Sequence, residues 1–196
     1  MTDNYKIYAG TLLLSLLTAC GGSSNINSAV EQPLVCGTGE PVPIDEGGIG
    51  DFSNDPDNPR VWALAPGANN LLAGTENGDP DYVAFTVDAC DTLDSITLNA
   101  FNADTGDTEV SISIQIGSTF DSDPLANTTS ELVGFASFGT ALVSQDLLAL
   151  AAQDTASTGL GAGTYTLFLS NPGETAEYTL VFDVSRVLIP LSLIHI

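Results

Sequence analysis

Alternating apolar and polar residues recur in short segments along most of the chain and predict β-strands. In the clearest run, residues 110–116, valine and isoleucine alternate with serine and glutamine. A period of two places successive side chains on opposite faces of a sheet, so that one face of each strand can be buried. Similar runs, separated by turn residues, predict further strands at residues 61–65, 70–74, 82–87, 93–101, 132–138, 163–170 and 177–184.

One segment departs from this pattern. Residues 140–152 are rich in leucine and alanine, which favour a helix, and their apolar side chains lie near one helical face. The last two strands flank Asn171-Pro172-Gly173, a turn sequence that predicts a hairpin. Together these elements predict an all-β fold, an antiparallel β-sandwich of about eight strands with one short helix.

The charge balance excludes several classes of partner and of chemistry. The chain has 25 acidic residues against 3 basic ones, and its net charge is −22. Such a chain repels nucleic acid and anionic lipid and attracts divalent cations. After Lys6 there is no lysine, and the single histidine is His195, second from the end. Catalytic triads built on histidine or lysine are therefore excluded from the body of the chain, no carboxylate pair is marked out for glycoside hydrolysis, and we expect no enzymatic activity.

The N-terminus has the features of an exported lipoprotein. Residues 9–19 form an apolar run, too short for a transmembrane helix, which needs about 20 residues. The run ends in Leu17-Thr18-Ala19-Cys20, which resembles the lipobox of bacterial lipoproteins. The resemblance implies that Cys20 carries diacylglycerol after cleavage, which anchors the protein in a membrane. Gly21, directly after Cys20, further implies the outer membrane of a Gram-negative cell envelope. The alternative to the lipobox is an ordinary signal peptide with an incidental cysteine.

Two cysteines remain, and in an exported protein such a pair tends to be oxidised. A disulfide between Cys36 and Cys90 closes a loop of 54 residues. By chain entropy it stabilises the fold by roughly 4 kcal/mol. Two free thiols are the alternative.

Motifs along the chain, in their order, resemble the bacterial pre-peptidase C-terminal domain. They are D-x-D-Y-x-x-F-x-V at residues 79–87 and L-x-A-G-T-Y-T-L at residues 160–167, and the resemblance covers residues 50–184. It implies a jelly-roll-like β-sandwich without catalytic residues, which in some members binds calcium. We therefore expect a surface binding or adhesion module for a polysaccharide or protein ligand. The alternative is an accessory domain or truncated fragment of a larger exported enzyme that degrades peptides or polysaccharides.

These features divide the chain into four parts. They are a lipoprotein signal peptide (1–19), a lipid anchor and polar tether (20–49), the β-sandwich domain (50–184) and an apolar tail (185–196). The last seven residues, PLSLIHI, resemble the translation of a sequencing-adapter fragment. An exposed apolar tail is also a liability on a folded domain, so we expect an artefact or a truncation there. A genuine final strand and the start of a missing sorting helix are the alternatives.

Aspartates gather in two places that can converge at one end of a sandwich. Asp51, Asp55 and Asp57 lie in the loop before the first strand, and Asp79 and Asp81 directly precede the strand at residues 82–87. Calcium takes about six to eight oxygen ligands, so these five residues are candidate metal ligands and calcium is the candidate cofactor. Their spacing does not match an EF-hand loop. The alternative is that they form turns and cap strands.

Overall fold

The computed structural model describes residues 36–75, 78–105, 108–121, 132–152, 159–171, 173 and 175–187. The chain divides into two units, residues 1–33 and 34–196, and the described residues belong to the second. The predicted signal peptide, Cys20 and most of the apolar tail, His195 included, lie outside the described residues.

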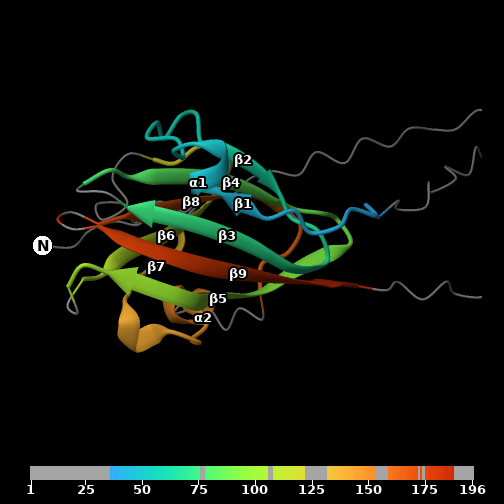
Figure 1. Cartoon of the computed structure of the whole chain (residues 1–196). Helices are drawn as coiled ribbons and strands as arrows, with labels where there is room; N and C mark the ends of the chain where they lie inside the picture. Colours follow the sequence, from blue (N-terminus) through green and yellow to red (C-terminus); the bar gives the residue numbers. More distant parts are fainter. Residues whose placement is uncertain are drawn as a thin grey trace, which may run out of the picture. The chain divides into compact units, whose positions relative to one another are not determined.

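Within the described residues nine strands form two sheets that pack face to face (Figure 1). They are β1 (Ile44–Asp45), β2 (Arg60–Ala63), β3 (Gly67–Thr75), β4 (Asp81–Val87), β5 (Asp91–Ala103), β6 (Val110–Ile116), β7 (Leu132–Phe138), β8 (Gly163–Ser170) and β9 (Ala176–Arg186). One sheet has the order β1-β3-β9-β5, and the other has the order β2-β4-β8-β6-β7. The all-β sandwich predicted from the alternation is confirmed.

The antiparallel pairs nest along the sequence as they do in a jelly roll. β3 pairs with β9, β4 with β8 and β6 with β7, so that strands pair from the outside of the chain inward. A long ribbon of this kind wraps into two sheets. On its other side β5 forms, among the described residues, two isolated bridges, Thr97 with Asp146 and Leu93 with Leu160. Asp146 and Leu160 both lie between β7 and β8, so described parts of that connection take the place of a regular strand beside β5.

The hairpin predicted around Asn171 does not form, because β8 and β9 belong to different sheets. β8 lies between β4 and β6, and β9 lies between β3 and β5, so each has antiparallel partners on both sides. The turn after β8 carries the chain across from one sheet to the other. A turn sequence specifies a reversal of the chain, but the sheet that receives the next strand is decided by these long-range pairings.

Two further details differ from the prediction. β1 pairs with β3, and β2 pairs with β4, in parallel, so the sheets are mixed at one edge each. The predicted helix at residues 140–152 is divided into a 3₁₀ turn, η1 (Thr140–Leu142), and a short helix, α2 (Leu147–Ala151). Between them Ser144 has a positive φ of 71°. The carboxylate of Asp146 accepts hydrogen bonds from Leu148 N in α2 and from Ile96 N in β5, so bonding to the sheet interrupts the helix.

The inward faces of the two sheets share one apolar core. Phe182 packs edge to face against two rings, with its ring centroid 5.4 Å from that of Phe85 and 5.1 Å from that of Trp62. The indole of Trp62 donates a hydrogen bond to Val42 O at 2.9 Å, which holds the segment before β1 against the sandwich. β1 and the short helix α1 (Glu46–Ile49) thus belong to the sandwich, although they precede the predicted domain boundary at residue 50.

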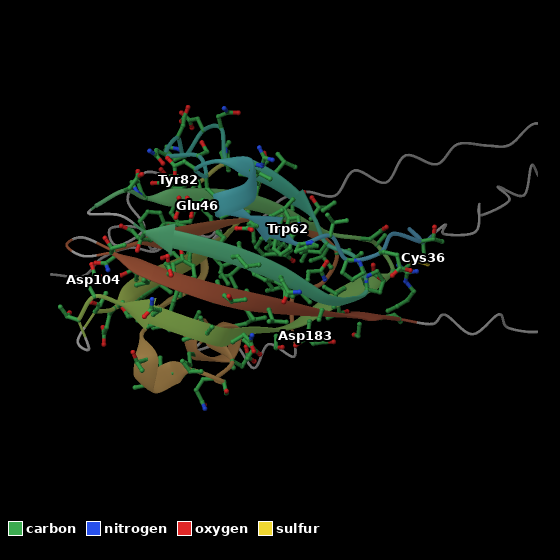
Figure 2. All side chains as sticks on the ribbon, viewed as in Figure 1. Cys36, Glu46, Trp62, Tyr82, Asp104 and Asp183 are labelled. Atoms are coloured by element: carbon green, nitrogen blue, oxygen red, sulfur yellow. A yellow bond between two sulfur atoms is a disulfide. The ribbon has the colours of Figure 1, made fainter. Side chains whose placement is uncertain are left out.

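The predicted disulfide between Cys36 and Cys90 is present, with the two Cα atoms 5.5 Å apart. It ties the start of the described chain to the turn between β4 and β5. Figure 2 shows Cys36 toward one end of the sandwich, with Glu46 and Tyr82 toward the other. Among the described residues no helix has the length and apolar character needed to cross a bilayer.

Candidate metal centre

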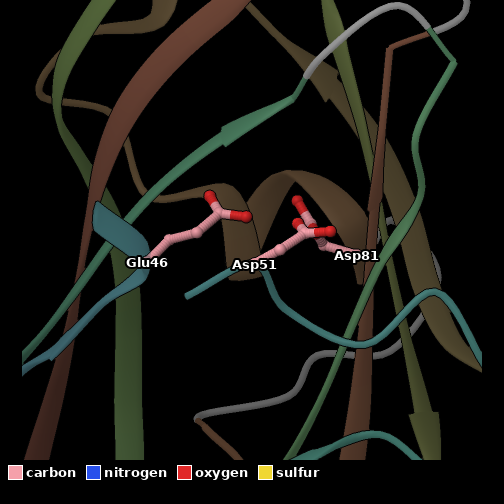
Figure 3. A group of neighbouring side chains, drawn as sticks. All are labelled: Glu46, Asp51 and Asp81. Atoms are coloured by element: carbon pink, nitrogen blue, oxygen red, sulfur yellow. The ribbon is translucent and has the colours of Figure 1, made fainter. Parts of the chain in front are cut away.

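Three carboxylates from separate segments converge at one end of the sandwich (Figure 3). Glu46 is the first residue of α1, Asp51 follows that helix, and Asp81 is the first residue of β4. One oxygen from each lies within 4.8 Å of one oxygen from each of the others. Asp81 is 1% exposed, Glu46 is half-buried and Asp51 is exposed, so the cluster reaches from the interior to the surface.

The backbone around α1 fixes the carboxylate of Glu46. The side chain of Asp45 caps the helix by accepting a hydrogen bond from Gly47 N at 3.0 Å. The two carboxylate oxygens of Glu46 accept from Phe52 N at 3.3 Å and from Gly74 N at 2.7 Å. Gly50 turns the chain with a φ of 90°, which favours glycine. Glu46 therefore joins its own loop to the end of β3.

β4 aims Asp81 into the sandwich. Asp81 shares the inward face of the strand with Val83 and Phe85, which are fully buried. Its Oδ2 atom is buried and has no hydrogen-bond partner. The next backbone amide, that of Tyr82, donates to Ser53 O at 2.9 Å. This bond fastens the loop that carries Asp51 alongside the start of β4.

The pKa of Asp81 is raised to about 8, mainly by burial and in addition by the negative charges of Glu46, Asp51 and Asp79. The pKa of Glu46 is also raised, mainly by burial and in part by Asp51, against the lowering effect of the hydrogen bonds from Gly74 and Phe52. Negative charges held this close in a buried place need a proton or a cation between them. Carboxylate oxygens from three segments are the ligands that hard cations such as calcium prefer.

An open groove of about 750 Å³ gives access to the cluster from the surface. It is lined by α1 and by residues of β3, β5 and β9, among them Leu72, Asn102 and Glu177. Asp51 and Asp79 also line it. The groove reaches the carboxylates of Glu46 and Asp51, and Asp81 lies behind them, with one oxygen within 4.8 Å of an oxygen of each.

The structure brings together two of the five predicted ligands. Asp51 and Asp81 belong to the cluster, and Asp79 lines the groove and adds its charge to the surroundings of Asp81. Asp55 and Asp57 are exposed and belong to a turn, in which Asp55 Oδ1 accepts a hydrogen bond from Asp57 N at 3.0 Å. For these two residues the geometry is that of turn formation.

The sequence prediction missed Glu46. Its candidate signal is the stretch D-E-G-G-I-G-D, in which Glu46 lies five residues before Asp51 within a loop rich in glycine. The contact that fixes its carboxylate comes from Gly74, 28 residues away along the chain. No local pattern contains that contact, so the loop alone could not select Glu46 from its acidic neighbours.

No family model and no curated protein matches this chain. Among solved structures, PliG, a periplasmic lysozyme inhibitor of g-type lysozyme from Salmonella Typhimurium, is similar at 9% sequence identity. The alignment covers 64% of this chain and 98% of PliG, with a TM-score of 0.34. A likeness this low carries no inference about partner or activity.

Proposed function

We propose that this chain is a non-catalytic, lipid-anchored β-sandwich module of the bacterial cell envelope that binds calcium through Glu46, Asp51 and Asp81. The observation that carries the proposal is the carboxylate of Asp81, which is 1% exposed and leaves Oδ2 without a partner. An unpaired buried carboxylate is strongly destabilising, and a divalent cation shared with two further carboxylates removes that penalty. Calcium suits the site because it accepts oxygen ligands in irregular geometry.

The bound cation acts as a structural clamp. It would join α1, the loop that follows and the start of β4. Without it, Glu46 bonds to this loop through Phe52 N and Gly50 N, and the loop bonds to β4 through Tyr82 N and Ser53 O. A ligand that binds the folded protein but not the unfolded chain stabilises the fold by RT ln(1 + [L]/Kd), so the stabilisation rises with the logarithm of the ligand concentration once that exceeds Kd. The stability of the segments at the rim of the groove therefore depends on the calcium concentration.

An envelope location and a binding role are supported by other features. The resemblance of residues 17–20 to a lipobox supports a lipid anchor at Cys20, and the disulfide between Cys36 and Cys90 suits an oxidising compartment. The resemblance to pre-peptidase C-terminal domains and the groove beside the cluster support a polysaccharide or protein ligand. The residue inventory supports a non-catalytic role, since histidine and lysine are missing between Lys6 and His195.

Calorimetric titration of the purified full chain with calcium chloride tests the proposal. We expect one saturable site above the weak surface binding of an acidic protein, and a melting temperature that falls when a chelator is added. Asp51→Asn should weaken binding at least tenfold, since it removes a charged ligand. Asp55→Asn is the matched control, because it removes an exposed charge from the neighbouring turn and keeps the Oδ1 acceptor. Absence of saturable binding by the unaltered protein would refute the cation site.

A further inference from the structure

The described residues contain four buried side-chain polar atoms without a hydrogen-bond partner. They are Thr75 Oγ1, Asp81 Oδ2, Asn171 Nδ2 and Tyr178 Oη. Their residues are 0%, 1%, 4% and 3% exposed in that order, so bulk solvent does not satisfy them. Native proteins pair almost all such groups with protein or with ordered water. Each of the four therefore requires an explanation.

All four lie at the end of the sandwich where the carboxylates converge. Thr75 ends β3 and Asp81 begins β4, with five residues between them. Tyr178 on β9 stands opposite Ala73, two residues before Thr75. Asn171 follows β8, in which Leu169 stands opposite Asp81, and Asn171 O accepts a hydrogen bond from Gly78 N at 3.0 Å.

These residues also point inward. Thr75 continues the buried face of β3 that contains Leu71 and Ala73, and Tyr178 continues the buried face of β9. Side chains two residues apart on a strand share one face. Asn69 also lies on the inward face of β3, near its other end, but its amide is hydrogen-bonded. Among the described residues, the buried polar atoms without a partner therefore gather at this one end, behind the carboxylate cluster.

Tyr178 lines the groove together with Glu46 and Asp51, and its buried hydroxyl makes no hydrogen bond to any described residue. Burial raises the pKa of its hydroxyl well above 10, and the charges of Asp81 and Glu46 raise it further. Its ring packs edge-on against Phe138 at 5.2 Å, which fixes its direction. A buried hydroxyl that lies near carboxylates but bonds to no protein group is typical of a polar contact bridged by water. A buried water of this kind needs about three polar partners, and these residues supply them.

We propose that Thr75, Asn171 and Tyr178 form an inner pocket that holds a water molecule against Asp81, and that this water is a ligand on the buried side of the cation. The inference rests on the cation site proposed above. Three carboxylates do not fill the six to eight positions of calcium. The groove supplies solvent on the exposed side, and the inner pocket supplies the ligand on the side that solvent does not reach. Tyr178 is thus a positioning residue, which acts through the water.

Tyr178→Phe tests the inner pocket, and Tyr165→Phe is its matched control. Tyr165 is also buried, but its hydroxyl donates to Gly161 O at 2.9 Å. In the full chain, Tyr178→Phe should weaken calcium binding about tenfold, as loss of an outer partner of a metal ligand does. It should not lower the melting temperature in chelator, since no protein hydrogen bond is lost. Tyr165→Phe should lower that temperature and leave calcium affinity unchanged.

Luminescence of bound europium(III) in H₂O and D₂O provides a readout that packing alone would not change, because it counts the waters on the ion. We expect fewer coordinated waters in Tyr178→Phe than in the unaltered protein. If Tyr178→Phe does not fold, Thr75→Val gives the same readouts, with the same expected direction. If the unaltered protein binds calcium and the variant has the same calcium affinity and the same number of coordinated waters, the inner pocket is refuted and the cation site is not. Failure of the unaltered protein to bind calcium would overturn both.

Discussion

Replacing Asp81 with asparagine should have opposite effects on the protein with and without calcium. Asparagine has nearly the same shape and carries no charge. Because the carboxylate of Asp81 is buried with Oδ2 unpaired, its ionised form opposes folding unless a cation is bound. We expect Asp81→Asn to raise stability in chelator and to abolish stabilisation by calcium.

The size of the effect follows from proton linkage. The pKa of Asp81 is about 8 in the folded protein, against an ordinary value near 4 in an unfolded chain. At pH 7 the unfolded carboxyl is ionised and the folded one still favours its proton, so the site lowers the free energy of unfolding by about 4 kcal/mol relative to a neutral side chain. For a chain of this size, that corresponds to a rise of roughly 8–16 °C in Tm in the variant.

The raised pKa of Asp81 also determines whether stability rises or falls with pH. A carboxyl with a raised pKa in the folded state binds its proton more tightly there than in the unfolded chain. The associated stability is fully present below about pH 4 and is lost as the pH rises through about 8. In chelator the unaltered protein should therefore lose stability from pH 5 to pH 8, and Asp81→Asn should lose less over the same interval.

Differential scanning calorimetry of both proteins measures these effects, with chelator or 1 mM calcium at pH 5 and pH 8. Calcium at pH 8 should raise the Tm of the unaltered protein and leave that of Asp81→Asn unchanged. Asp55→Asn controls for the general loss of one negative charge from an acidic protein. A lower Tm of Asp81→Asn than of the unaltered protein in chelator would refute the reasoning, because it would mean that the ionised carboxylate stabilises the calcium-free fold.

Three further predictions concern the fold and its anchor. Gly134→Ala should lower the free energy of unfolding by about 1–3 kcal/mol, because a Cβ at Gly134 would overlap the backbone carbonyl of Ala151 in α2. Gly161→Ala is the control and should be nearly neutral, since nothing lies within 4 Å of the added carbon. Chemical denaturation measures both. Asn69→Ala should lower stability by about 3 kcal/mol in the same assay, since the buried amide of Asn69 donates to Ala65 O, Gly67 O and Phe182 O and accepts from Ala65 N. Cys20→Ala should move the protein from the detergent phase to the aqueous phase of a phase-separation assay of expressing cells; equal partition of both forms would contradict lipid attachment at Cys20.

The strands were predictable because their signal is local. Residues 110–116 alternate so regularly that the predicted strand and β6 have the same bounds. The partners of the strands were not predictable in the same way. Both strands around Asn171 were found, yet their pairing as a hairpin was wrong, because each is held by two neighbours more distant in sequence. Alternation defines which face of a strand is buried, whereas sheet membership depends on contacts that no window of the sequence contains.

Two of the three carboxylates of the cluster were predictable, and the third was not, for a related reason. Asp81 could be predicted as a ligand because it directly precedes an alternating strand, and Asp51 could be predicted because it lies in an acidic loop. Asp55 and Asp57 have the same local character as Asp51, but they remain in an exposed turn. The backbone bond from Tyr82 N to Ser53 O holds the loop beside β4, whereas Pro56, between Asp55 and Asp57, accepts a hydrogen bond from Phe120 N at 2.9 Å. The turn that contains Asp55 and Asp57 is therefore held against a different segment.

A stronger signal for the cluster was present in the face of the strand that each polar residue occupies. Asp81 occupies the same face of β4 as Val83, Phe85 and Val87, a face that is otherwise apolar and buried. Thr75 and Asn171 break the apolar face in the same way at the ends of β3 and β8. A single polar residue on a buried face is destabilising and is usually removed by selection unless it is paired or has a function. Asn69 breaks the face of β3 near its other end, but its amide is hydrogen-bonded, whereas Asp81, Thr75 and Asn171 each leave a buried polar atom without a partner among the described residues. These unpaired groups at one end of the sandwich support the proposed binding site more specifically than the abundance of aspartate does, since acidic residues occur throughout this chain.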